Sequence, residues 1–292
     1  MTEIHSSSLN NNHLESHRPD EFVIDVCGLA RTYKSYKKSE GLWNSVRGLW
    51  RREFIEIEAL KPTSFRIPQG QIVGLVGANG AGKTTLLKTL SGLIHPSSGD
   101  ARVLGYRPWE RKNDFLRQIS LLLGQKNQLW WDISPADSFE LLRKIYDVDK
   151  LVAQQRIQEL SETLQCTQVL NIQLRRLSLG ERMKMELIGA LLHQPRVLFL
   201  DEPTIGLDIV AQNSIRKFLE KYVREQQPTI LLTSHYMDDI TELADRLLLM
   251  SKGSLVYDGS VPDFINKSSK SKNEEVDFES VIHEFLEKES RV

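Results

Sequence analysis

A glycine-rich turn between an apolar segment and a helix-forming segment constrains the fold more than any other feature of this chain. Residues 71–76 form a short apolar segment bounded by glycines, as in a buried parallel strand. Residues 77–84, Gly-Ala-Asn-Gly-Ala-Gly-Lys-Thr, fit the pattern G-x-x-x-x-G-K-[S/T], and a helix is expected from Lys83 to about Leu93. Backbone N–H groups of such a turn can surround a phosphate at the helix N-terminus. The sequence therefore predicts a phosphate-binding strand–loop–helix unit.

Each residue of this unit has an expected task. Lys83 would reach the β- and γ-phosphates of a nucleotide, and the Thr84 hydroxyl would coordinate Mg²⁺. The predicted cofactors are therefore ATP and Mg²⁺. The ATP-binding residues predicted from the loop are Gly77, Asn79, Gly80, Gly82, Lys83, Thr84 and Thr85.

A second apolar segment, 197–200, ends in the acidic pair Asp201-Glu202. A strand of this kind delivers its last residue to the carboxyl edge of the sheet, where α/β proteins bind ligands. Asp201 is the predicted magnesium ligand there, directly or through water. Glu202 is the predicted base that polarises the attacking water. Taken alone, Asp201-Glu202 would be an ordinary solvated pair, and the loop upstream changes that interpretation.

The rest of the chain alternates between strand and helix signals, which favours a parallel sheet with helices on its faces. Further strands are expected at 21–26, 229–232 and 246–250, and 96–99 is expected to be a turn. Helical periodicity from Ser138 to about Gln165 indicates an insert in this α/β core. Residues 1–20 are predicted to be a disordered tail. A Ser/Lys-rich connector is expected from Asn266 to Asn273, followed by an amphipathic segment from Phe278 to Leu286.

Bulk composition excludes several classes of protein. With 38 basic and 39 acidic residues, the net charge of −1 gives no support to a surface that wraps nucleic acid. The two cysteines, Cys27 and Cys166, predict neither a metal site nor a disulfide framework. No apolar segment approaches the roughly 20 residues that a membrane-spanning helix needs.

Six motifs in order resemble the ATP-binding subunits of ABC transporters. Leu177-Ser178-Leu179-Gly180-Glu181 resembles the signature motif, usually L-S-G-G-Q, and 201–208 resembles the joined Walker B motif and D-loop ending in Asp208. His235 resembles the switch histidine, and Gln125 resembles the Q-loop glutamine. Tyr33 resembles the aromatic residue that stacks on adenine, with Tyr36 as the alternative. The resemblance covers about Val23 to Asp258.

The resemblance implies a fold and a domain organisation. The fold is α/β: a RecA-like phosphate-loop NTPase core with a parallel sheet, an N-terminal antiparallel β subdomain and a helical insert. The implied ATPase domain is 21–265, with the helical subdomain at about 126–192 and a linker and C-terminal helix at 266–292.

The resemblance also implies a mechanism. Glu202, His235 and Gln125 would be catalytic, and Thr84, Gln125 and Asp201 would hold the metal. Ser178, Gly180 and Glu181 of one subunit would close over the ATP bound by the other, so the implied partner is a second copy of the chain. The further partner would be a transmembrane permease, and the implied location is the cytoplasmic face of the plasma membrane.

A narrower resemblance points to exporters whose permeases are of the type-2 class. It rests on Gly124–Asp132, on the L-S-L-G form of the signature and on the long insert after Tyr33. The transported substrate stays open, because the permease would recognise it; drugs, lipids and polysaccharides are all compatible.

Two departures from the family pattern concern the signature. Leu179 replaces its first glycine, and Glu181 replaces its glutamine. Ser178-x-x-Glu181 also fits a capping box, which would fix the start of a helix. The two interpretations are compatible, because an anion can share a helix N-terminus with a cap.

Three other functions compete with transport. Translation-associated ABC proteins carry two cassettes in one chain, and chromosome-maintenance ABC ATPases need a long coiled coil between phosphate loop and signature. Here Lys83 and Ser178 are only 95 residues apart. A simple phosphate-loop kinase would not need the signature or His235.

The segment from Lys34 to Phe54 departs most from a minimal ATPase of this family. Five apolar residues fall at helical spacing on one face, with basic residues around them. Two interpretations stay open: the stripe packs on the subunit's own sheet, or it contacts the permease or an anionic membrane surface. The stripe consists of Leu42, Trp43, Val46, Leu49 and Trp50.

Overall fold

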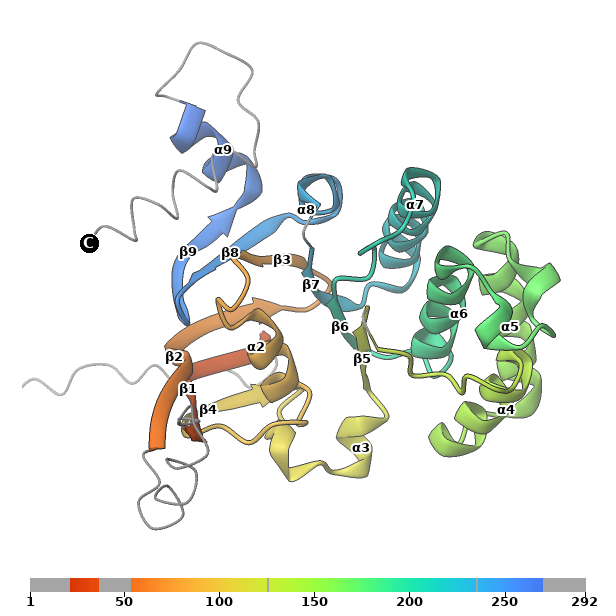
Figure 1. Ribbon diagram of the computed structural model, residues 1–292, viewed down its shortest axis with the longest axis horizontal. Helices are drawn as coiled ribbons and strands as arrows, with labels where there is room; N and C mark the ends of the chain where they lie inside the picture. The colour runs from red at the N-terminus through yellow and green to blue at the C-terminus, as the bar shows by residue number, and fades with distance from the viewer. Residues whose placement is uncertain (1–21, 37–53, 125, 235, 270–292) are drawn as a thin grey trace, which may run out of the picture.

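A computed structural model describes residues 22–36, 54–124, 126–234 and 236–269. Its centre is a six-stranded sheet in the order β5-β6-β7-β3-β8-β9 (Figure 1). Strands β5 to β8 pair in parallel, and β9 is antiparallel to β8. The strands are β3 (Ile72–Gly77), β5 (Ile119–Leu123), β6 (Val197–Asp201), β7 (Thr229–Thr233), β8 (Arg246–Ser251) and β9 (Ser254–Ser260).

A second, antiparallel sheet precedes and flanks the first. It has the order β2-β1-β4, from β1 (Phe22–Tyr36), β2 (Phe54–Pro68) and β4 (Ser98–Val103). Helix α2 (Lys83–Leu90) buries Leu86, Leu87 and Leu90 in one apolar core with residues of both sheets. Two short elements, η1 (Pro108–Glu110) and α3 (Asn113–Leu116), lead from this layer to β5.

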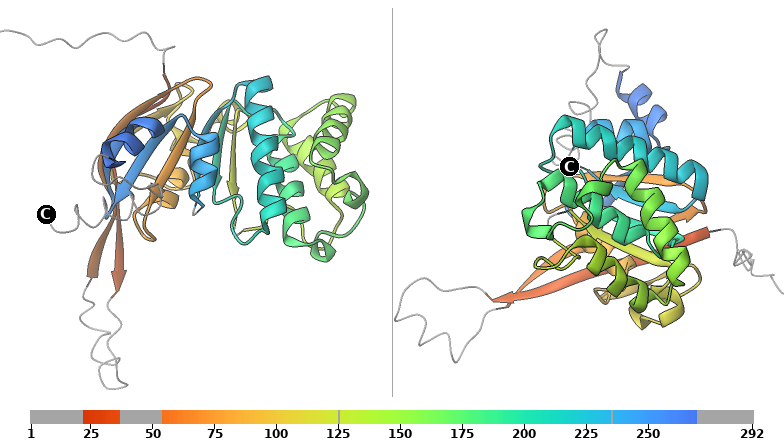
Figure 2. Two further views of the ribbon diagram at one scale, coloured as in Figure 1. Left: turned by 90° about the horizontal axis from the view of Figure 1, so that it is seen from above. Right: turned by 90° about the vertical axis from the view of Figure 1, so that its right-hand side faces the viewer.

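A helical subdomain lies beside the free edge of β5, at the right of Figure 1. It contains α4 (Pro135–Tyr146), α5 (Lys150–Thr163), the short η2 (Thr167–Val169) and η3 (Leu174–Arg176), and α6 (Leu179–Leu191). Helices α7 (Ile209–Gln226) and α8 (Met237–Leu243) cover the adjoining face of the sheet, as Figure 2 shows from two further sides. Helix α9 (Val261–Ser269) follows β9.

The alternation of side chains along β6 separates two cores. Val197 and Phe199 belong to the core that contains α2, whereas Leu198 and Leu200 belong to the core that contains α6. Successive side chains of a strand point to opposite faces. Helices α2 and α6 therefore pack on opposite faces of the same strand.

The predicted α/β class and the helical insert are confirmed, with shifts at several boundaries. The helix at Lys83 ends at Leu90, and the helical stretch expected from Ser138 to Gln165 is two helices, α4 and α5. Ser98 and Gly99, expected in a turn, begin β4. The connector expected from Asn266 instead continues α9 to Ser269. The predicted tail and the segment from Phe278 to Leu286 lie outside the described residues.

Both ends of the segment from Lys34 to Phe54 belong to the antiparallel sheet. The ladder between β1 and β2 continues to the pair Tyr36↔Phe54, so Lys34–Tyr36 and Phe54 are strand. Tyr33 and its alternative Tyr36 therefore lie on the same strand, β1. The apolar stripe itself lies within 37–53, outside the described residues, and both interpretations of it stay predictions.

Candidate nucleotide site

The loop between β3 and α2 is held by backbone contacts that leave no space for side chains at two glycines. A Cβ atom on Gly82, where φ is 103°, would lie 2.4 Å from the Ala59 carbonyl oxygen. A Cβ on Gly77 would lie 2.3 Å from the carbonyl oxygen of Met250. Asn79 and Gly80 are exposed at the turn of the loop. Strands β2 and β8 thus explain why glycine occupies both fixed positions of the motif.

Lys83 lies inside this loop. Its Nζ donates hydrogen bonds to the carbonyl oxygens of Gly77, at 2.7 Å, and Ala78, at 3.3 Å. The side chain is buried, and burial lowers its pKa, whereas the carboxylates of Glu202 and Asp201 act in the opposite direction. The ammonium is therefore positioned by the loop in a partly desolvated place, where its attraction to phosphate is stronger than in water.

The ends of three elements meet at Asp201, the last residue of β6. Its Oδ2 accepts a hydrogen bond from the Thr84 hydroxyl at 2.9 Å, and its Oδ1 accepts one from the Thr233 hydroxyl at 2.8 Å. Asp201 is only 9% exposed. A hydroxyl and a carboxylate side by side are the oxygen ligands that Mg²⁺ prefers. Two of the three predicted metal ligands, Thr84 and Asp201, thus fit the ion, and the third, Gln125, lies outside the described residues. The contact of Thr233 with Asp201 was not predicted from the sequence.

Glu202 begins the turn after β6 in an uncommon backbone conformation. Its φ is 56°, in the left-handed region that non-glycine residues rarely adopt. Its backbone N–H donates to the carbonyl oxygen of Thr233, at 3.1 Å, and to the Thr233 hydroxyl, at 3.0 Å. Such strain persists where surrounding contacts enforce it, typically at functional sites. Contacts with Thr233 thus hold the backbone of Glu202 in this conformation, and its role as the base stays a prediction.

Gly124 joins β5 to this edge of the sheet. Its N–H donates to the Asp201 carbonyl oxygen at 2.8 Å, and a Cβ on it would lie 2.1 Å from the Glu202 carbonyl oxygen. Gln125 lies outside the described residues, but the residue before it is fixed against the acidic pair. The sequence reasoning used Gly124 only as part of a longer motif. A glycine directly between an apolar strand and a polar segment could have indicated that another part of the backbone packs closely against it.

The signature segment forms the start of α6. Ser178 is its N-cap: the Ser178 Oγ accepts from the Glu181 N–H at 3.3 Å, and Glu181 Oε2 accepts from the Ser178 N–H at 3.0 Å. The capping box predicted from the sequence is therefore confirmed. Ser178 itself remains exposed.

The D-loop lies against the signature in the same chain. A Cβ on Gly206 would be 3.3 Å from the Leu179 side chain, and a Cβ on Gly180 would be 3.0 Å from that of Ala211. Asp208 caps α7 by accepting from the Ala211 N–H at 2.9 Å. The leucine that replaces the usual signature glycine therefore packs toward the chain's own D-loop.

Tyr33 and the residues around His235 complete the set of predicted positions. Tyr33 is half-buried on β1, with the Arg31 guanidinium 4.6 Å from its ring centroid, and its role at adenine stays a prediction. His235 lies outside the described residues. Ser234, directly before it, donates to Asp239 Oδ2 at 2.6 Å and accepts from the Tyr236 N–H. The backbone on both sides of His235 is thereby fixed at the end of β7.

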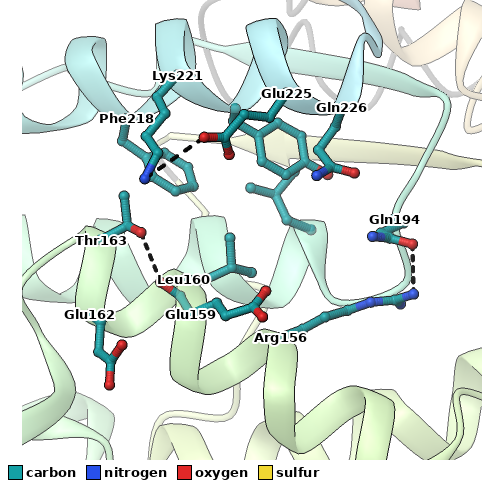
Figure 3. A pocket seen from close by; sticks show the side chains of 12 residues that line it. Arg156, Glu159, Leu160, Glu162, Thr163, Gln194, Phe218, Lys221, Glu225 and Gln226 are labelled. Carbon is teal, nitrogen blue, oxygen red and sulfur yellow. Dashed lines mark hydrogen bonds and ion pairs between the residues drawn. The ribbon is translucent and has the colours of Figure 1, made fainter.

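A pocket between α5 and α7 contains none of the predicted site residues (Figure 3). Its Arg156 donates to the Leu192 carbonyl oxygen and to Gln194 Oε1, at 2.8 and 2.6 Å. Tyr222 at its wall is buried, which raises the pKa of its hydroxyl to about 12. The main cation of this pocket is thus already engaged by protein oxygens, and the pocket is a seam between packed helices.

Within the described ranges, no helix has both the length and the apolar character needed to cross a membrane.

The fold and site define a phosphate-loop NTPase: a glycine loop and its lysine follow β3, and an acidic pair stands at the end of β6, the next strand but one in the same sheet. Comparison with known proteins gives the family. The sequence profile described as "ABC transporter" matches residues 60–205. The ABC transporter ATP-binding protein NatA of Bacillus subtilis (strain 168) is 31% identical over 205 residues, covering 70% of this chain and 83% of NatA.

Two further similarities extend the comparison. The probable multidrug ABC transporter ATP-binding protein YbhF of Escherichia coli (strain K12) is 30% identical over 240 residues, which are 80% of this chain but only 41% of YbhF. A solved structure of the ATP binding subunit of an ABC transporter superposes with a TM-score of 0.72 at 20% identity, covering 90% of this chain and 98% of the other. The chain belongs to the ABC transporter family, as an ATP-binding subunit with ATPase activity.

Proposed function

We propose that this chain powers an exporter: two copies enclose two ATP molecules, and their closing and opening drive a separate type-2 permease at the cytoplasmic face of the plasma membrane. The observation that carries the proposal is the division of the site. Lys83, Thr84 and Asp201 meet within one chain, whereas Ser178 is exposed at the start of a helix on the opposite face of β6.

Within one chain, the proposed chemistry is positioning and neutralisation of charge. Lys83 holds the terminal phosphates, Thr84 and Asp201 hold Mg²⁺, and Thr85 adds a donor to the phosphates. Glu202 orients the attacking water. Gln125 would contact the metal and His235 the γ-phosphate, while Tyr33 would stack on adenine. Mg²⁺ supplies neutralisation of the charge that develops on the transferred phosphoryl oxygens.

The second copy supplies what one chain lacks. The α6 N-terminus presents an exposed Ser178 beside half-buried Gly180 and Glu181, and its helix dipole favours a phosphate on the partner. Apolar side chains are exposed around it: Leu179 at 37%, Ile209 at 72% and Val210 at 80%. Such a surface suits burial against another protein. Both half-sites occur in this chain, so the proposed assembly is a homodimer.

A groove beside the helical subdomain is the proposed docking site for the permease. It is lined by residues of α2's end, α3, β5 and α4, and it includes Gln128, three residues after Gln125. Two of its apolar side chains, Leu93 and Ile145, are 54% and 60% exposed. A permease helix that occupies this groove would lie next to the segment that responds to nucleotide.

The export direction rests on the narrower motif resemblance and on relatives such as YbhF, whose name describes a probable multidrug transporter. The balanced net charge of −1 supports a protein rather than a nucleic acid as the partner.

The test uses washed inverted inner-membrane vesicles from the cells that make the protein. Purified chain should bind these vesicles, and its ATPase rate should rise when they are added. Ile145→Glu places a charge in the groove and should abolish both effects. The matched control is Leu151→Glu on α5, since Leu151 is 75% exposed and does not line the groove. Equal stimulation by protein-free liposomes, or equal behaviour of the two variants, would contradict the proposal.

A further inference from the structure

A carboxylate inside the helical subdomain has partners that the nucleotide site does not explain. Glu186 lies on α6, eight residues after the Ser178 cap, and is only 4% exposed. Its two oxygens accept from the backbone N–H of Gln128, at 3.0 and 3.1 Å, and from that of Leu129, at 3.3 Å each. Glutamate is rarely buried without a paired cation, so hydrogen bonds from a loop backbone make this contact unusual.

The loop side of this contact is fastened at a second place. The Gln128 side-chain amide donates to the Leu121 carbonyl oxygen in β5. The Leu129 side chain is 4% exposed, and its Cδ2 lies 3.0 Å from where a Cβ on Gly189 of α6 would be. The segment that begins three residues after Gln125 is thus attached to β5 on one side and to α6 on the other.

These contacts connect two positions that otherwise belong to different half-sites. Gly124, just before Gln125, is fixed against Asp201 and Glu202. Gln128, three residues after Gln125, is fixed by Glu186 to the helix that begins at Ser178. We propose that Glu186 is a positioning residue that makes the segment after Gln125 and the signature helix move as one body. A displacement at one chain's γ-phosphate or in its permease groove would then shift the signature that this chain offers to its partner. The inference rests on the proposed dimer and deepens it.

The charge of Glu186 strengthens the connection. Burial raises the pKa of its carboxyl to about 7, while the two amides and Arg182, one turn earlier on α6, act to lower it. On the loop side, Gln128 and Leu129 present uncharged backbone groups. The ionised carboxylate gives both amides a charged acceptor, and protonation removes that charge near neutral pH.

Glu186→Gln tests the connection, because the amide keeps the size of the side chain and removes the charge. At pH 8 the variant should hydrolyse ATP about tenfold more slowly, the effect expected for weakening charge-assisted bonds that position the signature. Its affinity for ATP should be parental, since the cis phosphate site is untouched. At pH 6, where Glu186 is protonated, the two rates should lie within about twofold of each other. Glu159→Gln, on α5, is the matched control and should change neither quantity.

Hydrogen exchange provides the structural readout. The amides of Gln128 and Leu129 should exchange about tenfold faster in Glu186→Gln than in the parent. Faster exchange with a parental rate of hydrolysis at pH 8 would show that the contact is only structural and would overturn the inference. If the variant does not fold, Glu186→Asp replaces it: its shorter side chain withdraws the carboxylate from both amides, so exchange should be faster and hydrolysis at pH 8 slower, and a parental rate would again overturn the inference. An inactive parent protein would instead overturn the proposed function, and exchange would still report on the connection.

Discussion

The phosphate-loop face and the helical-subdomain face of this molecule hold their functional residues in different ways. On the first face, Lys83 and Thr84 begin the helix that follows β3, and Asp201 ends β6; both strands pair in parallel with β7, which lies between them. On the second, the signature and the segment after Gln125 lie in α6 and in a loop beside it. The paired sheet fixes the first set, whereas a few side-chain contacts such as Glu186 to Gln128 fix the second.

This difference matches two tasks, ATP hydrolysis on the first face and the response to the second subunit on the other. A site that must neutralise charge gains from a rigid frame, because preorganised groups need no rearrangement when the reaction occurs. A site that must respond to a second subunit gains from elements that can move together. The low-stability end of a protein supplies such elements.

Substitution of Lys83 should have the largest effect on ATP affinity, and it should act only on the first face. Lys83→Ala removes the ammonium that the loop positions, so ATP affinity should fall about a hundredfold, the loss expected for charge-assisted bonds in a partly desolvated site. Calorimetric titration with ATP measures this. Lys88→Ala, in the last turn of the same helix, is the control. If Lys83→Ala binds ATP with parental affinity, the phosphate-loop face does not bind the nucleotide through a preorganised Lys83.

The pH dependence of the free energy of unfolding should report on the titration of Glu186 in the second face. The pKa of Glu186 is raised to about 7 in the folded protein, so the folded state binds the proton more tightly than the unfolded chain does. The stabilisation is full below the unfolded pKa of about 4.5 and is lost as the pH rises through 7, by up to about 3 kcal/mol.

Urea unfolding of the parent and of Glu186→Gln at pH 5 and pH 8 measures this effect. The parent should lose stability relative to the variant over that interval. A constant difference between the two proteins would mean that Glu186 does not titrate there.

Gly124→Ala should have the smallest of these effects, at the boundary between the two faces. The new Cβ would lie 2.1 Å from the Glu202 carbonyl oxygen, so the backbone must shift, at a cost of about 1–3 kcal/mol. Turnover should fall with little change in ATP affinity, because the shift affects Glu202 and the start of the Gln125 segment. Gly105→Ala, where nothing lies within 4 Å but φ is 78°, should cost stability through backbone strain and leave turnover unchanged. Identical turnover in both variants would argue against a close fit at Gly124.

The first face could be predicted almost residue by residue. Its chemistry occurs in runs of neighbouring residues, 77–84 and 201–202, each directly after an apolar strand. Local patterns therefore predicted Lys83, Thr84 and Asp201 as members of one site, and the Ser178–Glu181 capping box predicted the start of α6. Thr233 was missed, because a threonine at a strand end gives no sign of the carboxylate that it will contact across the sheet.

The second face could not be predicted in the same way. Glu186 and Gln128 are 58 residues apart, and a glutamate within an amphipathic helix predicts exposure rather than burial. The strand character of Lys34–Tyr36 was hidden by apolar residues at helical spacing farther along. Pairing with Phe54 and its neighbours decided it instead, a long-range contact that overrides local periodicity.

The ATP-dependent dimer is tested by measuring Glu202→Gln with ATP and with ADP. The variant should bind ATP with parental affinity and hydrolyse it about 10²–10⁴-fold more slowly, and light scattering should show a dimer with ATP but not with ADP. The loss of the base would preserve the sandwiched state, because both copies still supply Lys83, Thr84 and Ser178. Hydrolysis at the parental rate, or a monomer with ATP at every accessible concentration, would contradict it.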